Sequence, residues 1–281
     1  GPAGPPGPPG PAGDDGADGE PGTDGVDGAD APRPANIVWV AKDGSGDFET
    51  VNEALDAIGT TLPAATAASP YLIKIGPGEY VEAGGIDLQP HVSIEGSGAG
   101  VTVLRESGVL NPAVSADGID LSGVELRALS IVSADLYNHA LHLDSTTGVL
   151  VIRDASLTAE GDDAYGIDVV GGNVTVHDST ITGLGATFDG PEWAVQLDNG
   201  EIRIDGSTVI GKISIDYQGV AIATGSTLDD LGVSSTGTIR VIGSVVGGPH
   251  SVGGDGTIRC IGSISAFTLG PLDQNCGEVG P

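Results

Sequence analysis

Beyond residue 58, apolar and polar residues alternate in short runs separated by Gly, Ser, Asp and Asn. A period of two predicts β-strands with one buried face. The segment Phe48–Ile58 differs, because its apolar residues recur at helical spacing and Asp47 is placed to cap a helix there. A strand at Ile37–Val40 and a turn at Asp43–Gly46 precede this helix. The pattern therefore predicts a mostly β chain with one helix near its start.

A strand motif that ends in serine returns six times along the β region. The aligned serines are 23, 28, 19, 18 and 19 residues apart: Ser156, Ser179, Ser207, Ser226, Ser244 and Ser263. A weaker, earlier member centres on Ser130. A second set of alternating runs lies between these segments: Ala140–Asp144, Gly166–Val170, Ala194–Asp198 and Ile213–Asp216. Repeats of this length with two or three short strands each are typical of a parallel β-helix.

In that fold the inward residues of one coil stack on those of the next coil, about 4.8 Å away. We expect Val, Ile and Leu to form the interior ladders, and the aligned serines to mark a corner or an internal hydroxyl ladder. Open ends would expose backbone donors and acceptors, so residues 48–58 are expected to cap the first coil and residues 260–281 the last. A twisted β-sandwich is the alternative fold, since Asn199–Gly200 suits a hairpin turn. The regular serine spacing fits that alternative poorly.

Glycine occupies every third position of residues 1–30, ten times in succession. This is the period of collagen, where only Gly fits at the axis on which three chains meet. Residues 1–30 are therefore predicted to be a collagen-like stalk of a homotrimer, residues 31–36 a junction and residues 37–281 the β-helix. The second half of the stalk carries seven carboxylates and no basic residue. Because these charges repel one another, the head is expected to help hold the three chains together.

The chain is strongly acidic, with 39 Asp and Glu against 10 Lys and Arg and a formal net charge of −29. This balance argues against nucleic acid and against insertion into or binding to an anionic membrane, since nucleic acids and anionic lipids need a basic face. It allows Ca²⁺ binding without demonstrating it, and no other cofactor is indicated. The chain contains no Met, as expected of a mature or excised fragment. Because collagen-like segments are usually extracellular, Cys260 and Cys276 are expected to form a disulfide, two free buried thiols being the alternative.

The start of the β region resembles the pectin-lyase-like superfamily, and in particular the opening of pectin methylesterases. The resemblance rests on Val40–Ile58 with its Gly-Ser-Gly-Asp-Phe motif, on Tyr71–Glu82 with Gly-Glu-Tyr-Val-Glu, and on Val92–Gly98. It covers about sixty residues and implies a right-handed parallel β-helix with an N-terminal capping α-helix. The catalytic motifs that the resemblance would bring, Q-D-T-L, D-F-I-F-G and L-G-R-P-W, do not occur in the sequence.

Other candidate sites are fragmentary. Gly161-Asp162-Asp163 resembles the G-D-D motif of polygalacturonases, but G-H-G is missing, Asn138-His139-Ala140 stands where N-T-D should be, and Arg203-Ile204-Asp205 has an acid in place of the R-I-K lysine. Asp162 and Asp163 are thus a weak candidate ligand or metal site, with a solvated turn as the simpler interpretation. His139 and His142 are expected to point to opposite faces of a strand. Four aromatic residues can stack on sugar rings or pack between rungs or subunits: Tyr137, Tyr165, Trp193 and Tyr217.

Together these observations favour a non-catalytic extracellular or surface-appendage protein. Its β-helix head would trimerise, nucleate the triple helix and contact a glycan or a surface receptor. The missing motifs predict that the chain is not an enzyme. The alternative is a polysaccharide lyase, hydrolase or esterase of a tailspike or secreted type, and a structural spacer without a ligand is the third interpretation.

Overall fold

The computed structural model describes residues 1–5, 7, 36–108, 111–134, 138–161, 164–184, 193–248, 250–265 and 276. Contacts between Cα atoms divide the chain into two units, Gly1–Arg33 and Pro34–Pro281. Most of the glycine-repeat segment and of the junction lies outside the described residues. The collagen triple helix, the homotrimer and the boundaries drawn at residues 30 and 36 therefore stay predictions.

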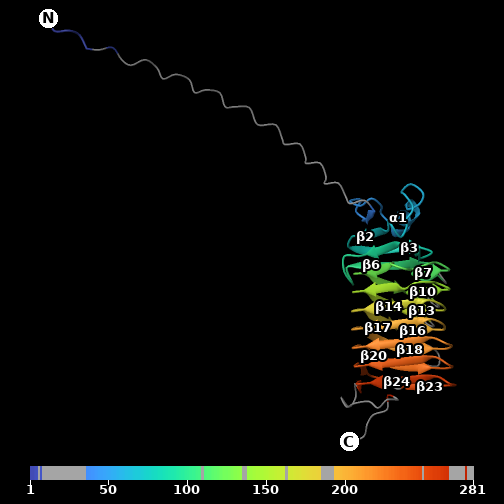
Figure 1. Cartoon of the computed structure of the whole chain (residues 1–281). Coiled ribbons are helices and arrows are strands. Elements are labelled where there is room, and N and C mark those ends of the chain that lie inside the picture. The colour runs from blue at the N-terminus through green and yellow to red at the C-terminus, as the bar shows by residue number, and fades with distance from the viewer. Residues whose placement is uncertain are drawn as a thin grey trace. The chain divides into compact units, whose positions relative to one another are not determined.

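The second unit winds into a right-handed parallel β-helix (Figure 1), which confirms the predicted fold class. Its strands form three columns in which each strand pairs in parallel with its counterpart on the next coil. The first column contains β1 (Ile37–Val40), β2 (Tyr71–Ile75), β5 (Val92–Glu95), β8 (Glu125–Arg127), β11 (Leu150–Arg153), β14 (Asn173–His177), β17 (Glu201–Asp205), β19 (Val220–Thr224), β21 (Thr238–Ile242) and β24 (Thr257–Ile261).

The other two columns belong to one sheet, because two long strands, β18 (Thr208–Ile215) and β20 (Thr227–Val233), run through both of them. The second column also contains β3 (Gly78–Ala83), β6 (Thr102–Ser107), β9 (Ser130–Ser133), β12 (Ser156–Ala159), β15 (Thr180–Gly183), β22 (Val245–Val246) and β25 (Ile264–Ser265). The third column also contains β4 (Ile86–Asp87), β7 (Val114–Asp117), β10 (Leu141–Asp144), β13 (Ile167–Val169), β16 (Trp193–Leu197) and β23 (His250–Val252).

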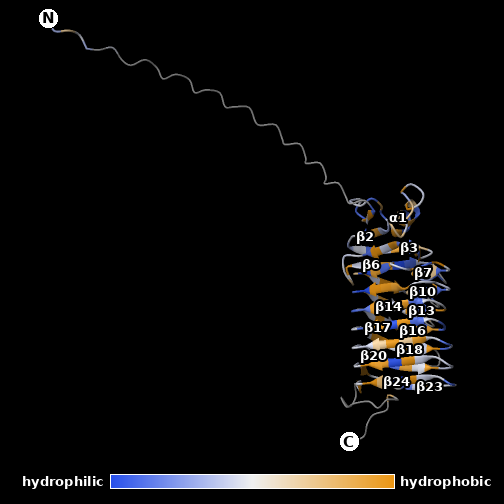
Figure 2. Cartoon of the chain, viewed as in Figure 1, coloured by the Kyte–Doolittle hydropathy of each residue, from blue (hydrophilic) through white to orange (hydrophobic). Residues whose placement is uncertain are grey.

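The core consists of ladders of aliphatic side chains that run the length of the β-helix. In the first column Ile94 pairs with Leu126, Leu126 with Ile152 and Ile152 with Val176, and all four are fully buried. Figure 2 shows hydrophobic stretches returning on the strands of successive coils. Burying one such side chain contributes about 1.5–3 kcal/mol, so the alternation seen in the sequence is what holds the coils in place.

The same two residues recur at the corner between the first and second columns. The first has positive φ and follows the end of the strand, and the second points inward. The positive-φ residue is Asp178, Gly206, Gly225, Gly243 or Gly262 on five successive coils, with φ between 47° and 62°. Glycine adopts this conformation without a Cβ penalty and Asp tolerates it, which explains the Gly-Ser and Asp-Ser pairs of the repeat.

The serines that follow form the internal hydroxyl ladder that the repeat predicts. Each serine N–H donates to the next serine's Oγ: Ser179 to Ser207 at 3.1 Å, Ser207 to Ser226 at 3.2 Å, Ser226 to Ser244 at 3.1 Å and Ser244 to Ser263 at 3.4 Å. The assignment of Ser156 to this ladder is wrong. Ala155 holds that place and donates its N–H to Ser179, while Ser156 lies one residue later and pairs with Ser130 and Thr180.

The first coil is covered by the helix α1 (Val51–Ala57), which is shorter than predicted. Its N-cap is Thr50, not Asp47, and Thr50 and Glu53 form a capping box. Asp47 instead accepts a hydrogen bond from the N–H of Trp39 at 2.9 Å. The buried Glu82 of β3 accepts the N–H of Val51 at 2.7 Å, so a carboxylate from the sheet satisfies a free donor of the helix and holds it over the coil.

At the other end, a disulfide joins Cys260 on β24 to Cys276, with 5.1 Å between the Cα atoms. Both cysteines are buried. The remainder of the predicted C-terminal cap lies outside the described residues. No helix within the described part of the chain is long and apolar enough to cross a membrane.

Replacing Ser226 by Ala is expected to destabilise the β-helix by about 1–3 kcal/mol, because the buried N–H of Ser207 loses its acceptor. Urea unfolding followed by circular dichroism measures the change. The neighbouring exposed Thr227 is the control, and Thr227→Ala should change the free energy of unfolding by less than about 0.5 kcal/mol. Equal effects of the two substitutions would contradict the ladder's role.

Candidate functional site

The outer face of the third column carries a row of polar side chains, one from each coil. The strand register places Ser115, His142, Asp168, Gln196 and Ser214 side by side. Their neighbours along each strand, such as Leu141 and Leu143, point inward and are fully buried. The apolar ladder therefore fixes which side chains face outward, and parallel pairing aligns them.

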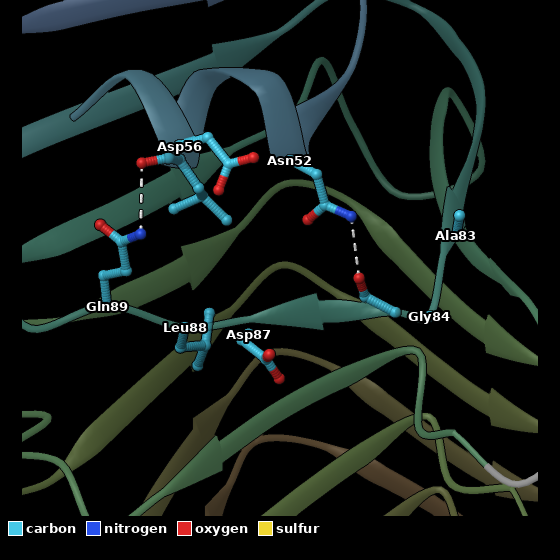
Figure 3. Close-up of a pocket in the computed structure, with 9 residues that line it drawn as sticks. Asn52, Asp56, Ala83, Gly84, Asp87, Leu88 and Gln89 are labelled. Atoms are coloured by element: carbon cyan, nitrogen blue, oxygen red, sulfur yellow. Dashed lines mark hydrogen bonds between the residues drawn. The ribbon is translucent and has the colours of Figure 1, made fainter. Parts of the chain in front are cut away.

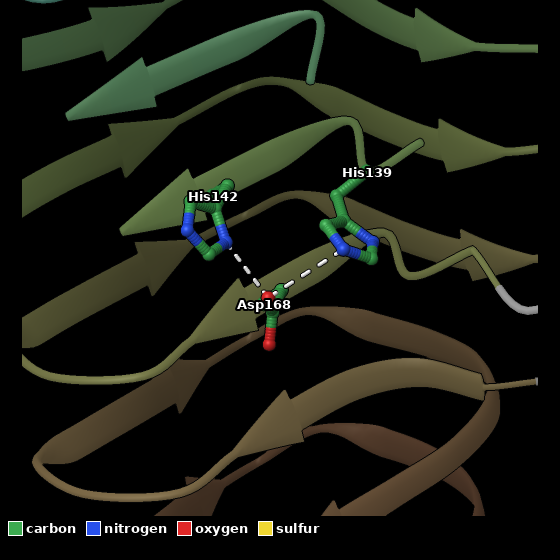
Figure 4. Close-up of side chains that lie close together, drawn as sticks. All are labelled: His139, His142 and Asp168. Carbon is green, nitrogen blue, oxygen red and sulfur yellow. Dashed lines mark hydrogen bonds and ion pairs between the residues drawn. The ribbon is translucent and has the colours of Figure 1, made fainter. Parts of the chain in front are cut away.

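A short polar contact within this row joins His142 to Asp168, with Nδ1 2.7 Å from Oδ2 (Figure 4). The hydrogen bond to Asp168 raises the pKa of His142, burial opposes it, and the charges of Asp168, Asp144 and Asp117 raise the pKa further. The Asp168 side chain is 10% exposed and that of His142 is 29% exposed. Nδ1 is the ring nitrogen that faces the carboxylate, and the other ring nitrogen, Nε2, takes no part in this contact.

His139 contacts the same carboxylate, with Nε2 3.6 Å from Asp168 Oδ2. The expectation that His139 and His142 point to opposite faces is wrong, since their rings stack with centroids 5.8 Å apart. The reason is that β10 begins only at Leu141, so strand alternation does not apply to His139.

The protonation of His139 follows from its other contact. The backbone N–H of Tyr165 donates to Nδ1 at 3.1 Å, so the proton of the neutral ring lies on Nε2, toward Asp168. Burial lowers the pKa of His139, against the opposing charge of Asp168. The ligand atoms of His139, His142 and Asp168 lie within 4.8 Å of one another and are the one such group in the described part of the chain. With its Nε2 protonated, however, His139 cannot serve as a neutral metal ligand.

A second acidic group adjoins Asp168. The amide nitrogen of Gln196 donates to Asp198 at 3.2 Å and to Asp216 at 2.5 Å. Burial raises the pKa of Asp198, the Gln196 hydrogen bond opposes it, and the charges of Asp216 and Asp168 raise the pKa further. These carboxylates therefore lie close enough to repel one another.

Aromatic rings line the edge of the row. Tyr165 stacks on Trp193 with centroids 5.1 Å apart and planes 9° apart, and His139 lies 4.9 Å from Tyr165. Two of the four aromatic residues singled out in the sequence thus stack on each other across adjacent coils, and both are half-buried. Tyr217 is 59% exposed, and Tyr137 lies outside the described residues.

A cavity of about 400 Å³ lies between α1 and β4, at the N-terminal end of the same row (Figure 3). Its lining is polar and acidic, with Asn52, Asp56, Asp87 and Gln89. Asn52 donates to the carbonyl of Gly85 at 3.0 Å, and Gln89 donates to that of Leu55 at 3.2 Å. Asp87 also accepts the hydroxyl hydrogen bond of Ser115, so a hydrogen bond links the cavity lining to the row.

The site residues that the sequence favoured are not those that the structure gathers. Asp162 and Asp163 lie outside the described residues, and their role stays untested. His142, Asp168 and Gln196 were missed, although a signal was present. When Ala140–Asp144, Gly166–Val170 and Ala194–Asp198 are aligned, each contributes its third residue to one row. The resemblance to polygalacturonases favoured Asp162 and Asp163 instead.

Solved structures show the same fold across most of the chain. Pectin methylesterase PemA from Erwinia chrysanthemi matches with a TM-score of 0.58 at 11% identity, covering 89% of this chain and 94% of that one. The carrot pectin methylesterase gives 0.53 at 14% identity, covering 90% and 91%. The enzyme from Yersinia enterocolitica gives 0.51 at 12% identity, covering 83% and 94%. No protein-family model matches the sequence, and no curated protein matches it.

These matches overturn the prediction that the chain is not an enzyme. The fold is that of enzymes over almost the whole β-helix. Missing family motifs cannot exclude catalysis on a face that carries its own histidine–aspartate pair. At this low identity, the likeness establishes the fold and leaves the chemistry to the residues.

The raised pKa of His142 predicts a pH-dependent contribution to stability. The attraction between the imidazolium and Asp168 is fully present below the ordinary histidine pKa of about 6.5 and is lost as pH rises through the raised value. Asp168→Asn should therefore destabilise the protein more at pH 6 than at pH 9, as measured by urea unfolding.

The matched control is Asp205→Asn on the first column, where His177 lies 3.6 Å from a carboxylate that is 41% exposed. The loss in free energy of unfolding caused by Asp205→Asn should differ little between the two pH values, since exposed ion pairs are weak. If Asp168→Asn lowers the free energy of unfolding equally at both pH values, His142 and Asp168 have no charge interaction.

Proposed function

We propose that this protein is a polysaccharide-processing hydrolase that cleaves an ester, with His142 as its acid–base group. The observation that carries the proposal is the 2.7 Å contact between His142 Nδ1 and the shielded Asp168 carboxylate. A carboxylate that holds one ring nitrogen of a histidine fixes the tautomer and leaves the other nitrogen free to take a proton. The fold shared with pectin methylesterases supports a polysaccharide ester as the substrate class.

In the proposed reaction, His142 Nε2 removes a proton from a water molecule as its oxygen attacks the ester carbonyl. The resulting imidazolium is stabilised by Asp168, in contact at Nδ1. The same proton is then given to the departing alkoxide, so the products are a carboxylic acid and an alcohol. Asp168 orients and stabilises the ring throughout. His139 cannot replace His142 as the base, because its lone pair on Nδ1 accepts the Tyr165 N–H.

The experiment measures the release of methanol and acetate from methyl- and acetyl-esterified polysaccharides, including pectin and capsular polysaccharides. His142→Gln and Asp168→Asn should each lower kcat/KM at least 100-fold, because general acid–base catalysis is worth about 10²–10⁴-fold. His177→Gln and Asp205→Asn alter the comparable pair on the first column and should leave activity unchanged. No release from any ester, or equal activity in His142→Gln, would refute the proposal.

We also propose that the enzyme is an extracellular homotrimer. Ten uninterrupted Gly-X-Y triplets support the three-chain state, and the Cys260–Cys276 disulfide fits an oxidising compartment. Sedimentation equilibrium of the full chain should give about three times the chain mass of 27.7 kDa. A mass equal to that of one chain at micromolar concentration would contradict the trimer.

A further inference from the structure

Most basic residues of the chain lie on one column of the β-helix. Six of the ten Lys and Arg residues lie on the first column: Lys74, Arg127, Arg153, Arg203, Arg240 and Arg259. The third column has the opposite character. Along its coils stand Asp87, Asp117, Asp144, Asp168, Asp198 and Asp216, and Lys212 is the one Lys or Arg among its described strand residues. The face that carries His142 is therefore strongly negative.

The centre of this face has more hydrogen-bond acceptors than donors. Gln196 is 6% exposed, and its oxygen Oε1 has no hydrogen-bond partner among the described residues. The amide nitrogen of the same side chain is already committed to Asp198 and Asp216. The next residue in the row is Asp168, whose carboxylate also only accepts. The side chains at the centre of this face therefore offer mostly acceptors, and such a face suits a ligand that donates hydrogen bonds.

We propose that this face binds a glycan with protonated amino groups, the ammonium nitrogens lying against the Asp168–Gln196–Asp198–Asp216 cluster. This deepens the proposed function, on which it rests, by naming the substrate class. An ammonium group supplies three hydrogen-bond donors and a positive charge. Its donors can pair with the excess acceptors, and its charge offsets the repulsion that Asp216 and Asp168 exert on Asp198. The Tyr165–Trp193 stack beside the cluster offers apolar ring surface to sugar rings.

Two other ligand classes fit this face less well. A hard metal ion needs several carboxylate oxygens close together. Within the described chain, the one group of three or more His, Cys, Asp or Glu side chains with ligand atoms within 4.8 Å is His139, His142 and Asp168, which contains a single carboxylate. A polyuronate would bring its own carboxylates against the aspartate row, and like charges raise the free energy of binding. The guanidinium groups that suit carboxylates lie on the first column instead.

The test measures binding affinities by titration calorimetry at pH 6 and low salt. The ligands are tetrasaccharides of glucosamine, N-acetylglucosamine and galacturonate. Spermine is the fourth ligand, as a cation that lacks sugar rings. The glucosamine oligomer should bind at least tenfold more tightly than each of the other three. Galacturonate binding as tight as glucosamine binding would overturn the proposal. Spermine binding as tight as glucosamine binding would also overturn it, since charge alone would then explain the result.

Two double variants are compared. One combines Asp198→Asn and Asp216→Asn in the cluster. The other, the control on the first column, combines Glu201→Gln and Asp205→Asn. The first should weaken glucosamine-oligomer binding at least tenfold and reduce its salt dependence, and the second should leave binding unchanged. Unchanged binding in the first variant would place the ligand elsewhere. Because binding is measured without turnover, an absence of ester hydrolysis with intact glucosamine binding would refute the proposed reaction and keep this site.

Discussion

The described β-helix depends throughout on the parallel stacking of coils in register. Each inward side chain rests on its counterpart in the next coil, as in the ladder from Ile94 through Leu126 to Ile152. A slip of one residue would turn a whole strand inside out. The positive-φ corner and the buried serine after it prevent that slip, because Ser207 and Ser226 can bond only when their coils are aligned. Backbone geometry at one corner thus fixes the positions of side chains on the other columns.

The candidate site follows from that alignment. His142 and Asp168 are 26 residues apart in sequence, yet they meet because their strands are neighbours in the third column. The same stacking gathers the aspartates of successive coils on one face and the arginines on another. A β-helix therefore produces charged faces from isolated residues of a repeat. In this chain the negative face coincides with the histidine–aspartate pair, which links the proposed acid–base chemistry to the proposed preference for an amino-bearing glycan.

The sequence predicts the fold well, because alternation and the corner serines are local signals. The strands, the cap helix and the serine ladder from Ser179 onward follow from it directly. The candidate site was harder to predict, since it depends on which coils are adjacent and on where a strand begins. His139 was misjudged because it precedes β10, and Ser156 because Ala155 fills the corner on its coil. The prediction that the chain is not an enzyme rested on missing family motifs. Motifs also gave no sign of the acidic third column, because its aspartates belong to none of them.

In the proposed reaction, the proton that His142 carries against Asp168 governs the rate. Two pH curves test this role: that of kcat/KM for an ester-bearing polysaccharide, and that of the His142 imidazole followed by NMR in the same protein. Activity should rise with pH as His142 loses its proton, and both curves should share one pKa above the ordinary histidine value of about 6.5. A rate that follows a different pKa, or that falls as His142 becomes neutral, would contradict the proposed role of His142.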